Sequence, residues 1–265
     1  MNHSGGPKVV VEQRDHVLLI GINRPEKRNA FDLELIDQFG AAYESLGTDP
    51  DLRVGVVHAF GDHFSAGLDL AEVGPKVAEM GPAALAGDYQ FDPFGMWAPP
   101  VPKPVVMAVQ GIAYTLSIEL ALASDIVIAA DDVRFRQLEI GRGIIPFGGA
   151  TLRATAQLGW GNAMRFLLTA DQFGADEAYR IGLVQEVVAP GEQFDRAVAI
   201  AETIAAQAPL GVQETLANAR IARDRGEEAA REHLKEVLPR ILTSQDAAEG
   251  VRSFLERREA RFTGQ

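Results

Sequence analysis

The sequence contains no cysteine and only five histidines among its 265 residues. The absence of cysteine excludes disulfides, thiolate nucleophiles, iron–sulfur clusters and cysteine-ligated zinc. Positive charge is also scarce, because 25 Lys and Arg stand against 37 Asp and Glu, and the net charge of -12 argues against nucleic acid or an anionic membrane as a partner. We expect one large domain, or one domain with an appendage, from a reducing compartment such as the cytoplasm.

Long hydrophobic runs free of charge are lacking as well. The one stretch of membrane-spanning length, 105–130, carries Glu119 and Asp125 near its middle, and each carboxylate would be costly inside a bilayer. The start, from Met1 to Lys8, has neither the apolar core of a signal peptide nor the Arg- and Ser-rich pattern of a transit peptide. These features predict a soluble protein with no targeting segment and no membrane partner.

Three common catalytic motifs are incomplete. The segment Gly141-Arg-Gly-Ile-Ile-Pro146 has proline where a dinucleotide fingerprint needs its third glycine. Ser65 lacks the first glycine of a nucleophile elbow, and His58 and His63 stand five residues apart rather than at the helical spacing of a zinc protease. We therefore expect no nicotinamide cofactor, no serine nucleophile and no bound metal.

What the sequence does contain is an alternation of strand and helix patterns up to about residue 190. Such alternation predicts an α/β fold. From Pro190 onward the pattern is helical only, so we divide the chain into an α/β core, 1–190, and a helical part, 191–265, that packs on the core or on a neighbouring subunit. The expected strands are Val9–Gln13, Val17–Ile22, Val54–Ala59, Val105–Val109 and Ile126–Ala129, and the expected helices begin after Asp32 and at Leu116, Phe194, Pro209 and Gln245.

The segment from Leu70 to Pro104 has a different texture. Glycine and proline interrupt every regular pattern, yet large apolar side chains such as Phe94, Met96 and Trp97 lie among them. A long irregular segment of this kind is more typical of a flap that lines a pocket than of a linker. The alternative is a surface loop that buries its aromatic side chains in the core.

Four segments together resemble the crotonase superfamily, and within it the enoyl-CoA hydratases. They are Phe64–Leu70, Lys103–Gly111, Ile118–Asp125, and Phe135–Glu139 with Gly143–Gly149. The resemblance extends from Asn23 to Phe262, nearly the whole chain. It implies a spiral core of repeated ββα units with a helical C-terminal part, an acyl-CoA substrate, no metal or organic cofactor, and assembly into a homotrimer or homohexamer.

The resemblance also implies an oxyanion hole made of backbone N–H groups. Reactions at the α or β carbon of a thioester place negative charge on its oxygen, and fixed N–H donors stabilise that charge. By resemblance the donors are the N–H groups of Ala66 and of Leu116, which opens a helix. Here Thr115-Leu116-Ser117 replaces the family's glycine run. The N–H survives any substitution except proline, so we expect Leu116 to keep a negative φ and to point its side chain away from the ligand.

Two glutamates occupy the positions of the family's acid/base pair. Glu119 follows Leu116 by three residues, which places its carboxylate on the same face of the helix as the N–H donor, and Glu139 follows 20 positions later. Two carboxyl groups can share the activation of water and the delivery of a proton to carbon. The alternatives are a structural role for Glu119 and a salt bridge from Glu139 to Arg136 or Arg142.

By resemblance, coenzyme A contacts two segments of the chain. One is the loop of Arg28, Asn29 and Ala30, and the other comprises Ala66, Gly67, Leu68, Asp69 and Leu70. Arg28 or Lys27 offers a positive charge for phosphate, unless both are only solvated loop charges. The tail around Phe262, with its nearby arginines, resembles a C-terminal end that can reach the ligand of an adjacent subunit.

The leading hypothesis is a hydro-lyase that adds water reversibly and syn to a 2-enoyl-CoA. The first alternative is an isomerase that moves the double bond of a 3-enoyl-CoA, although isomerases of the family often keep only one of the two carboxylates. The second alternative is an acyl-CoA binding protein without catalytic activity, which the replaced glycine run would suit.

Overall fold

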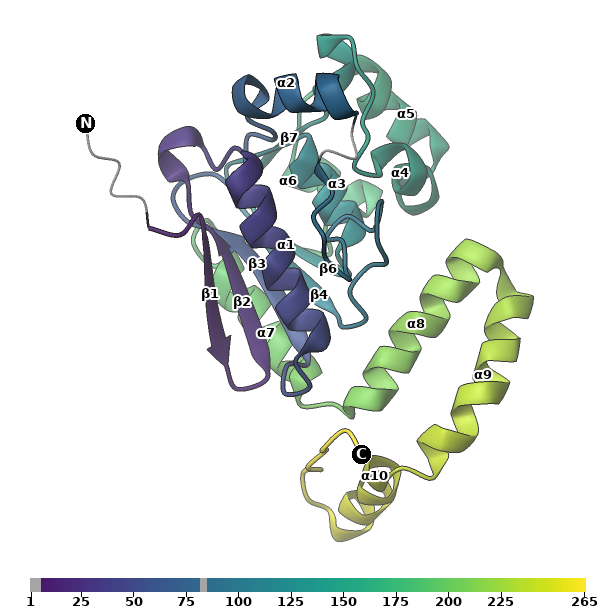
Figure 1. Ribbon diagram of the computed structural model, residues 1–265. Coiled ribbons are helices and arrows are strands. Elements are labelled where there is room, and N and C mark those ends of the chain that lie inside the picture. Colours follow the sequence, from purple (N-terminus) through teal and green to yellow (C-terminus); the bar gives the residue numbers. More distant parts are fainter. Residues whose placement is uncertain (1–5, 82–84) are drawn as a thin grey trace.

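A six-stranded sheet forms the centre of the molecule in the computed structural model, which describes residues 6–81 and 85–265 (Figure 1). The start of the chain before Gly6, and Pro82 of the glycine- and proline-rich segment, lie outside the described residues. The strand order is β1-β2-β3-β4-β6-β9, and only the pair β1–β2 is antiparallel. Its strands are β1 (Val9–Arg14), β2 (Val17–Ile22), β3 (Val54–Ala59), β4 (Val105–Val109), β6 (Ile126–Ala130) and β9 (Glu186–Val188).

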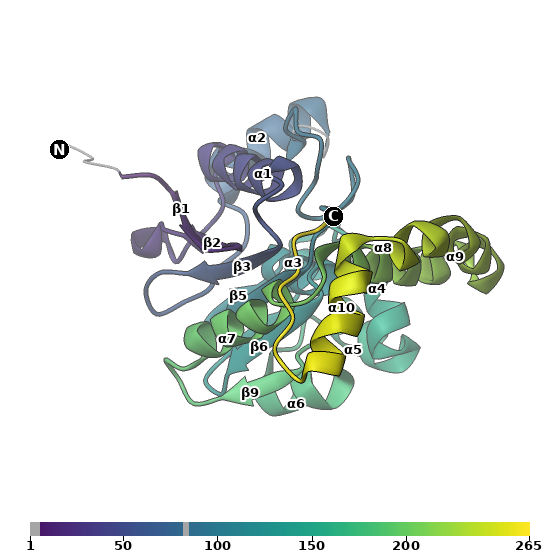
Figure 2. The same ribbon diagram turned by 90° about the horizontal axis from the view of Figure 1, so that it is seen from below.

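Helices cover both faces of this sheet (Figure 2). The helices are α1 (Leu33–Thr48), α2 (Leu70–Met80), α3 (Leu116–Ala123), α4 (Ala150–Leu158), α5 (Trp160–Thr169), α6 (Ala175–Ile181), α7 (Gln193–Ala205), α8 (Pro209–Arg225), α9 (Glu227–Leu242) and α10 (Gln245–Glu256). The 3-10 helices whose bounds lie within the described residues include η1 (Pro25–Lys27) and η3 (Glu139–Arg142).

The strand side chains alternate between two buried clusters. On β2, Leu18 and Ile20 join the cluster that includes α1 and α3, whereas Val17 and Leu19 join the cluster beneath α7. All six residues of β2 are therefore buried, as is typical of a strand in a parallel sheet with helices on both faces. This arrangement confirms the expected α/β class.

A second sheet of three short strands lies beside the first, in the order β5-β7-β8. Its strands are β5 (Ile112–Tyr114), β7 (Arg134–Arg136) and β8 (Phe173–Gly174). The chain passes from β4 to β5 and then into α3, and it passes again from β6 to β7. This repeated passage from the large sheet to the small sheet and into a helix is the ββα repeat of the expected spiral core.

After β9 the described chain is helical apart from its tail, but the first of these helices belongs to the core. α7 packs across β2, β3, β4 and β6 and closes the second buried cluster. α8 and α9 lie side by side and extend away from the sheet (Figure 1), and α9 exposes Leu234, Leu238 and Leu242. The division at residue 190 and the homo-oligomer stay predictions.

Helix α2 occupies a segment that the sequence analysis treats as irregular. Gly74 and Pro75 lie within it, yet the chain is helical from Leu70 to Met80. The side chain of Val73 is fully buried, and this packing outweighs the poor helix propensity of its neighbours. None of the helices in the described part of the chain is both long and apolar enough to cross a membrane.

Candidate active site

A cavity of about 410 Å³ opens between α3, η3 and the irregular segment that follows α2. Phe94, Met96 and Trp97 line it, which confirms that the segment between Leu70 and Pro104 lines a pocket. The cavity brings together most of the residues expected at the site. These are Ala30, Ala66, Leu68, Asp69, Leu70, Leu116, Glu119 and Glu139.

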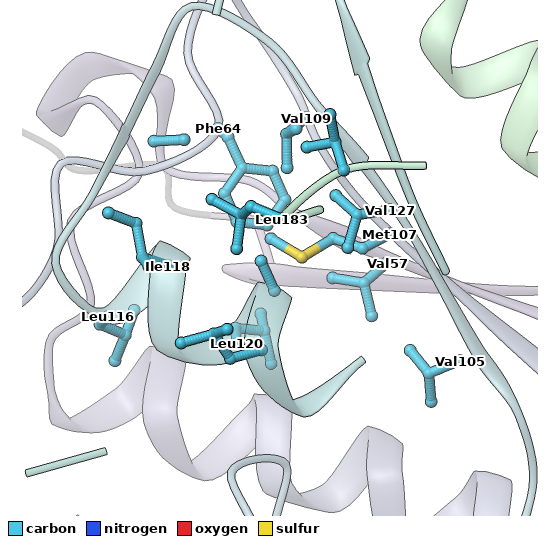
Figure 3. Packing of buried hydrophobic residues seen from close by; sticks show 14 of the residues in the cluster. Val57, Phe64, Val105, Met107, Val109, Leu116, Ile118, Leu120, Val127 and Leu183 are labelled. Atoms are coloured by element: carbon cyan, nitrogen blue, oxygen red, sulfur yellow. The ribbon is translucent and has the colours of Figure 1, made fainter. Parts of the chain in front are cut away.

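Glu119 lies in the first turn of α3, a helix that is buried on every side. Apolar neighbours such as Ile118 and Leu120 anchor α3 among the side chains of the sheet (Figure 3). The Oε1 atom of Glu119 accepts hydrogen bonds from the N–H groups of Gly148, at 2.8 Å, and Ala150, at 3.2 Å. Burial raises the pKa of this carboxyl, and the two N–H donors oppose that effect. The carboxylate is therefore fixed in orientation while it faces the cavity.

Glu139 opens η3 on another wall of the cavity and is only 8% exposed. Its Oε2 atom is buried and has no hydrogen-bond partner among residues 6–81 and 85–265. Burial, and then the negative charge of Glu119, raise the pKa of Glu139 to about 7. Among the described residues, Glu139 forms no salt bridge with Arg136 or Arg142. Arg136 instead donates to the carbonyl oxygen of Ala170, and Arg142 makes no ion pair.

The structure does not leave the N–H of Ala66, the expected oxyanion donor, free to bind a ligand. The N–H of Ala66 donates to the carbonyl oxygen of Arg28 at 2.9 Å, so it is already bonded within the protein. Leu68 pairs with Phe31 in a parallel bridge that uses the N–H and C=O groups of the residues flanking Leu68. The N–H of Leu68 points the other way, and no acceptor for it occurs in the described part of the chain. The N–H left without an acceptor in this turn is therefore that of Leu68, two residues after Ala66.

The N–H of Leu116 is available in the way that the sequence predicts. Leu116 is the first residue of α3, so its N–H has no acceptor within the helix, and none occurs elsewhere among the described residues. The unusual backbone falls on Thr115, whose φ is 50° and ψ is -111°. Such a conformation is strained for a β-branched residue and costs about 1–3 kcal/mol. Thr115 stands where the resemblance implies a glycine, so the strained backbone lies next to the N–H of Leu116.

A buried polar network joins the two segments that carry these N–H groups. The carbonyl oxygen of Ser65 accepts from the hydroxyl of Ser117 at 3.2 Å and from the N–H of Tyr114 at 3.0 Å. The hydroxyl of Ser65 donates to the carbonyl oxygen of Asn29 at 2.7 Å. The sequence analysis missed this network. The signal that could have revealed it is a single serine, Ser65 or Ser117, within each of two otherwise apolar segments.

The residues expected to hold coenzyme A are only partly brought together. Lys27 lines the cavity, whereas Arg28 and Gly67 do not. Asp69 pairs with the buried Arg24 at 2.9 Å. Gly67 instead allows a close approach, because a Cβ atom there would lie 2.0 Å from the Oγ1 of Thr115.

The C-terminal tail does not line this cavity in the single chain. The tail folds back on its own chain, where Asp246 accepts from the N–H groups of Thr263 and Gly264 and Arg53 donates to the carbonyl oxygen of Phe262. Its contact with another subunit stays a prediction. No group of three potential metal ligands occurs in the residues that the structure describes.

The proteins to which this chain is similar in sequence and structure include enoyl-CoA hydratases and hydratase/isomerases. The family model of enoyl-CoA hydratase/isomerase matches residues 12–265. A probable enoyl-CoA hydratase/isomerase from Mycobacterium abscessus superposes with a TM-score of 0.93 at 49% identity, over 97% of this chain and 99% of that one. Enoyl-CoA hydratase EchA19 from Mycobacterium tuberculosis is 31% identical over 97% of each chain.

A relative from a different bacterium shows the same similarity over nearly its whole length. The crotonyl-CoA hydratase of Syntrophomonas wolfei is 32% identical over 96% of this chain and 97% of its own length. The match covers the core, the cavity and the C-terminal helices alike, so it is not confined to one motif. The chain therefore belongs to the enoyl-CoA hydratase/isomerase family of the crotonase superfamily.

Proposed function

We propose that this protein catalyses the reversible syn addition of water to a 2-enoyl-CoA, giving a 3-hydroxyacyl-CoA. The observation that carries the proposal is the convergence of two buried carboxyl groups and two available N–H groups on one largely apolar cavity. The names of similar proteins, which include enoyl-CoA hydratase and crotonyl-CoA hydratase, support the same reaction.

The thioester oxygen accepts hydrogen bonds from the N–H groups of Leu68 and Leu116. As charge grows on that oxygen, the two donors stabilise it, and loss of one such donor costs about 2.7–4 kcal/mol in a comparable enzyme. The opening of α3 adds the positive end of a helix dipole. Because Ser65 and Ser117 tie the two donor segments together, the distance between the donors is set before substrate binds.

The two glutamates divide the proton transfers. Glu119 holds the water molecule and takes one of its protons as the remaining hydroxide adds to C3 of the substrate. Glu139, protonated near neutral pH because its pKa is raised to about 7, gives its proton to C2. Exchange with solvent then returns the proton from Glu119 to Glu139. This scheme uses only water and groups of the chain, so it needs no cofactor.

Coenzyme A enters along the wall formed by Lys27, Ala30 and the segment from Leu68 to Leu70. Lys27 lines the cavity and offers a positive charge to a phosphate in a chain that is otherwise strongly acidic. Arg28 contributes instead through its carbonyl oxygen, which holds the turn that presents Leu68.

The test is the ultraviolet absorbance of the conjugated thioester after addition of the protein to crotonyl-CoA and 2-octenoyl-CoA. We expect the absorbance to fall and a product heavier by one water molecule to accumulate. The double variant Glu119→Gln/Glu139→Gln should leave both substrates unchanged. Faster conversion of a 3-enoyl-CoA to its 2-enoyl isomer would instead make the protein an isomerase, and tight binding without turnover would make it a binding protein.

A further inference from the structure

A second, smaller cavity adjoins the first and has a volume of about 110 Å³. We call it the side chamber. The two cavities share five wall residues, namely Ile36, Leu85, Asp92, Phe94 and Trp97. Its remaining walls come mainly from α1 and from the segment between residues 86 and 98. The side chamber is therefore next to the main cavity at these shared residues.

The position of the side chamber identifies which part of a substrate can reach it. Neither glutamate lines it, nor does Leu68 or Leu116, so the reacting carbons and the thioester oxygen lie elsewhere. Lys27 and Ala30, on the wall proposed for coenzyme A, do not line it either. The remaining part of an acyl-CoA is the far end of its acyl chain.

The chemistry of the side chamber is apolar. Most of its walls are aromatic or aliphatic, with Phe31, Phe39 and Phe91 among them. The hydroxyl of Tyr89 already donates to Asp37 at 2.7 Å.

The one carboxylate in these walls is also already bonded. The two oxygens of Asp92 accept from the N–H groups of Phe94, Met96 and Trp97, at distances of 2.7–2.9 Å. Apart from the indole N–H of Trp97, the polar side chains of the described walls are thus already bonded within the protein.

We propose that the side chamber binds the hydrocarbon end of the acyl chain and makes the protein selective for apolar enoyl groups longer than crotonyl. The proposal rests on the proposed function, because it concerns the substrate of the same site. A cavity of roughly 150 Å³ accepts a benzene ring, so 110 Å³ accommodates a hydrocarbon segment of about four carbons. The described walls offer no Lys, Arg or His to pair with a chain that ends in a carboxylate.

The first experiment measures kcat/KM of the wild-type protein for crotonyl-, 2-hexenoyl-, 2-octenoyl- and 2-decenoyl-CoA. We expect 2-octenoyl-CoA to exceed crotonyl-CoA at least tenfold. A 2-octenoyl-CoA that carries a terminal carboxylate should fall at least tenfold below the uncharged substrate. Equal values for crotonyl- and 2-octenoyl-CoA, or equal values with and without the carboxylate, would overturn the proposal.

A variant that fills the side chamber sharpens this test. Ala98 lines the side chamber but not the main cavity, and Ala41 lies on the exposed face of α1. In Ala98→Leu the ratio of kcat/KM for 2-octenoyl- over crotonyl-CoA should fall at least tenfold, whereas Ala41→Leu should keep the wild-type ratio. An unchanged ratio in folded Ala98→Leu contradicts the proposal. Absence of hydration for every substrate refutes the proposed function instead, so the two failures can be told apart.

Discussion

Glu119 and Glu139 face the same cavity from two regions of the fold that treat a carboxyl group differently. Glu119 lies inside a largely buried helix, and two backbone N–H groups donate to its Oε1. Glu139 lies in a short 3-10 helix, and its Oε2 is buried without a partner in the described chain. Burial raises the pKa of both, but N–H donors counteract the rise at Glu119, whereas the charge of Glu119 adds to it at Glu139.

The difference supports unlike roles for these two like residues in the proposed reaction. Hydrogen bonds to an ionised carboxylate favour the charged form, so the two N–H donors make Glu119 better suited than Glu139 to accept a proton from water. A carboxyl group that is desolvated and lies near a negative charge keeps its proton to higher pH, so Glu139 is suited to donate one. The surroundings of the two carboxyl groups, rather than their residue type, make their pKa values respond differently.

The largest expected effect is the loss of the proton donor. Glu139→Gln should lower kcat about 10³-fold, because the amide has no proton to give to carbon. Glu119→Gln should lower kcat about 10²-fold, since the amide oxygen can still accept the N–H groups of Gly148 and Ala150 while the amide nitrogen holds the water. Both rates would be measured with a saturating 2-enoyl-CoA.

The control for this pair is Glu236→Gln on the exposed face of α9, which should behave as wild type. Affinity for a saturated acyl-CoA should change less than threefold in Glu119→Gln and Glu139→Gln, which shows that the cavity is intact. Equal losses in the two variants, or a larger loss in Glu119→Gln, would contradict the division of roles.

A smaller effect should follow when only the support of Glu119 is disturbed. A Cβ atom on Gly148 would lie 2.4 Å from the Oε2 of Glu119, so Gly148→Ala must displace that carboxylate. We expect kcat to fall about tenfold with little change in KM, because misplacement by about 1 Å disturbs the attack of water more than binding. Gly161→Ala on α5, where a Cβ meets nothing within 4 Å, is the matched control. A wild-type kcat in Gly148→Ala would show that the orientation of Glu119 is unimportant.

The fold could be predicted well wherever local pattern and tertiary packing agree. The strands β2, β3 and β4 are short apolar runs bounded by turns, and they begin and end where the sequence predicts. Helix α2 could not be predicted, because Gly74 and Pro75 obscure a helix that the burial of a single side chain, Val73, stabilises.

The two carboxyl side chains and the available N–H of Leu116 could be predicted from the sequence, but the second available N–H could not. Glu119 and Glu139 are recognised by residue type and spacing, and both line the cavity. The oxyanion donor is a property of strand pairing, since the bridge between Phe31 and Leu68 decides which N–H is bonded and which is left. No side chain indicates which N–H is bonded, so the sequence alone points to Ala66 although the unbonded N–H is that of Leu68.

The smallest expected effect concerns how Glu119 tunes Glu139. In the wild type, kcat/KM should fall about tenfold per pH unit above about 7, because Glu139 then loses the proton that it must donate. Removal of the charge in Glu119→Gln lowers the pKa of Glu139, so the midpoint of this alkaline limb should move to lower pH and cost a further few-fold in rate at pH 7. The limb should vanish in Glu139→Gln. Measurement of kcat/KM from pH 5 to 9 in all three proteins tests this, and an unmoved limb in Glu119→Gln would show that burial alone, the first cause of the raised pKa, holds the proton on Glu139.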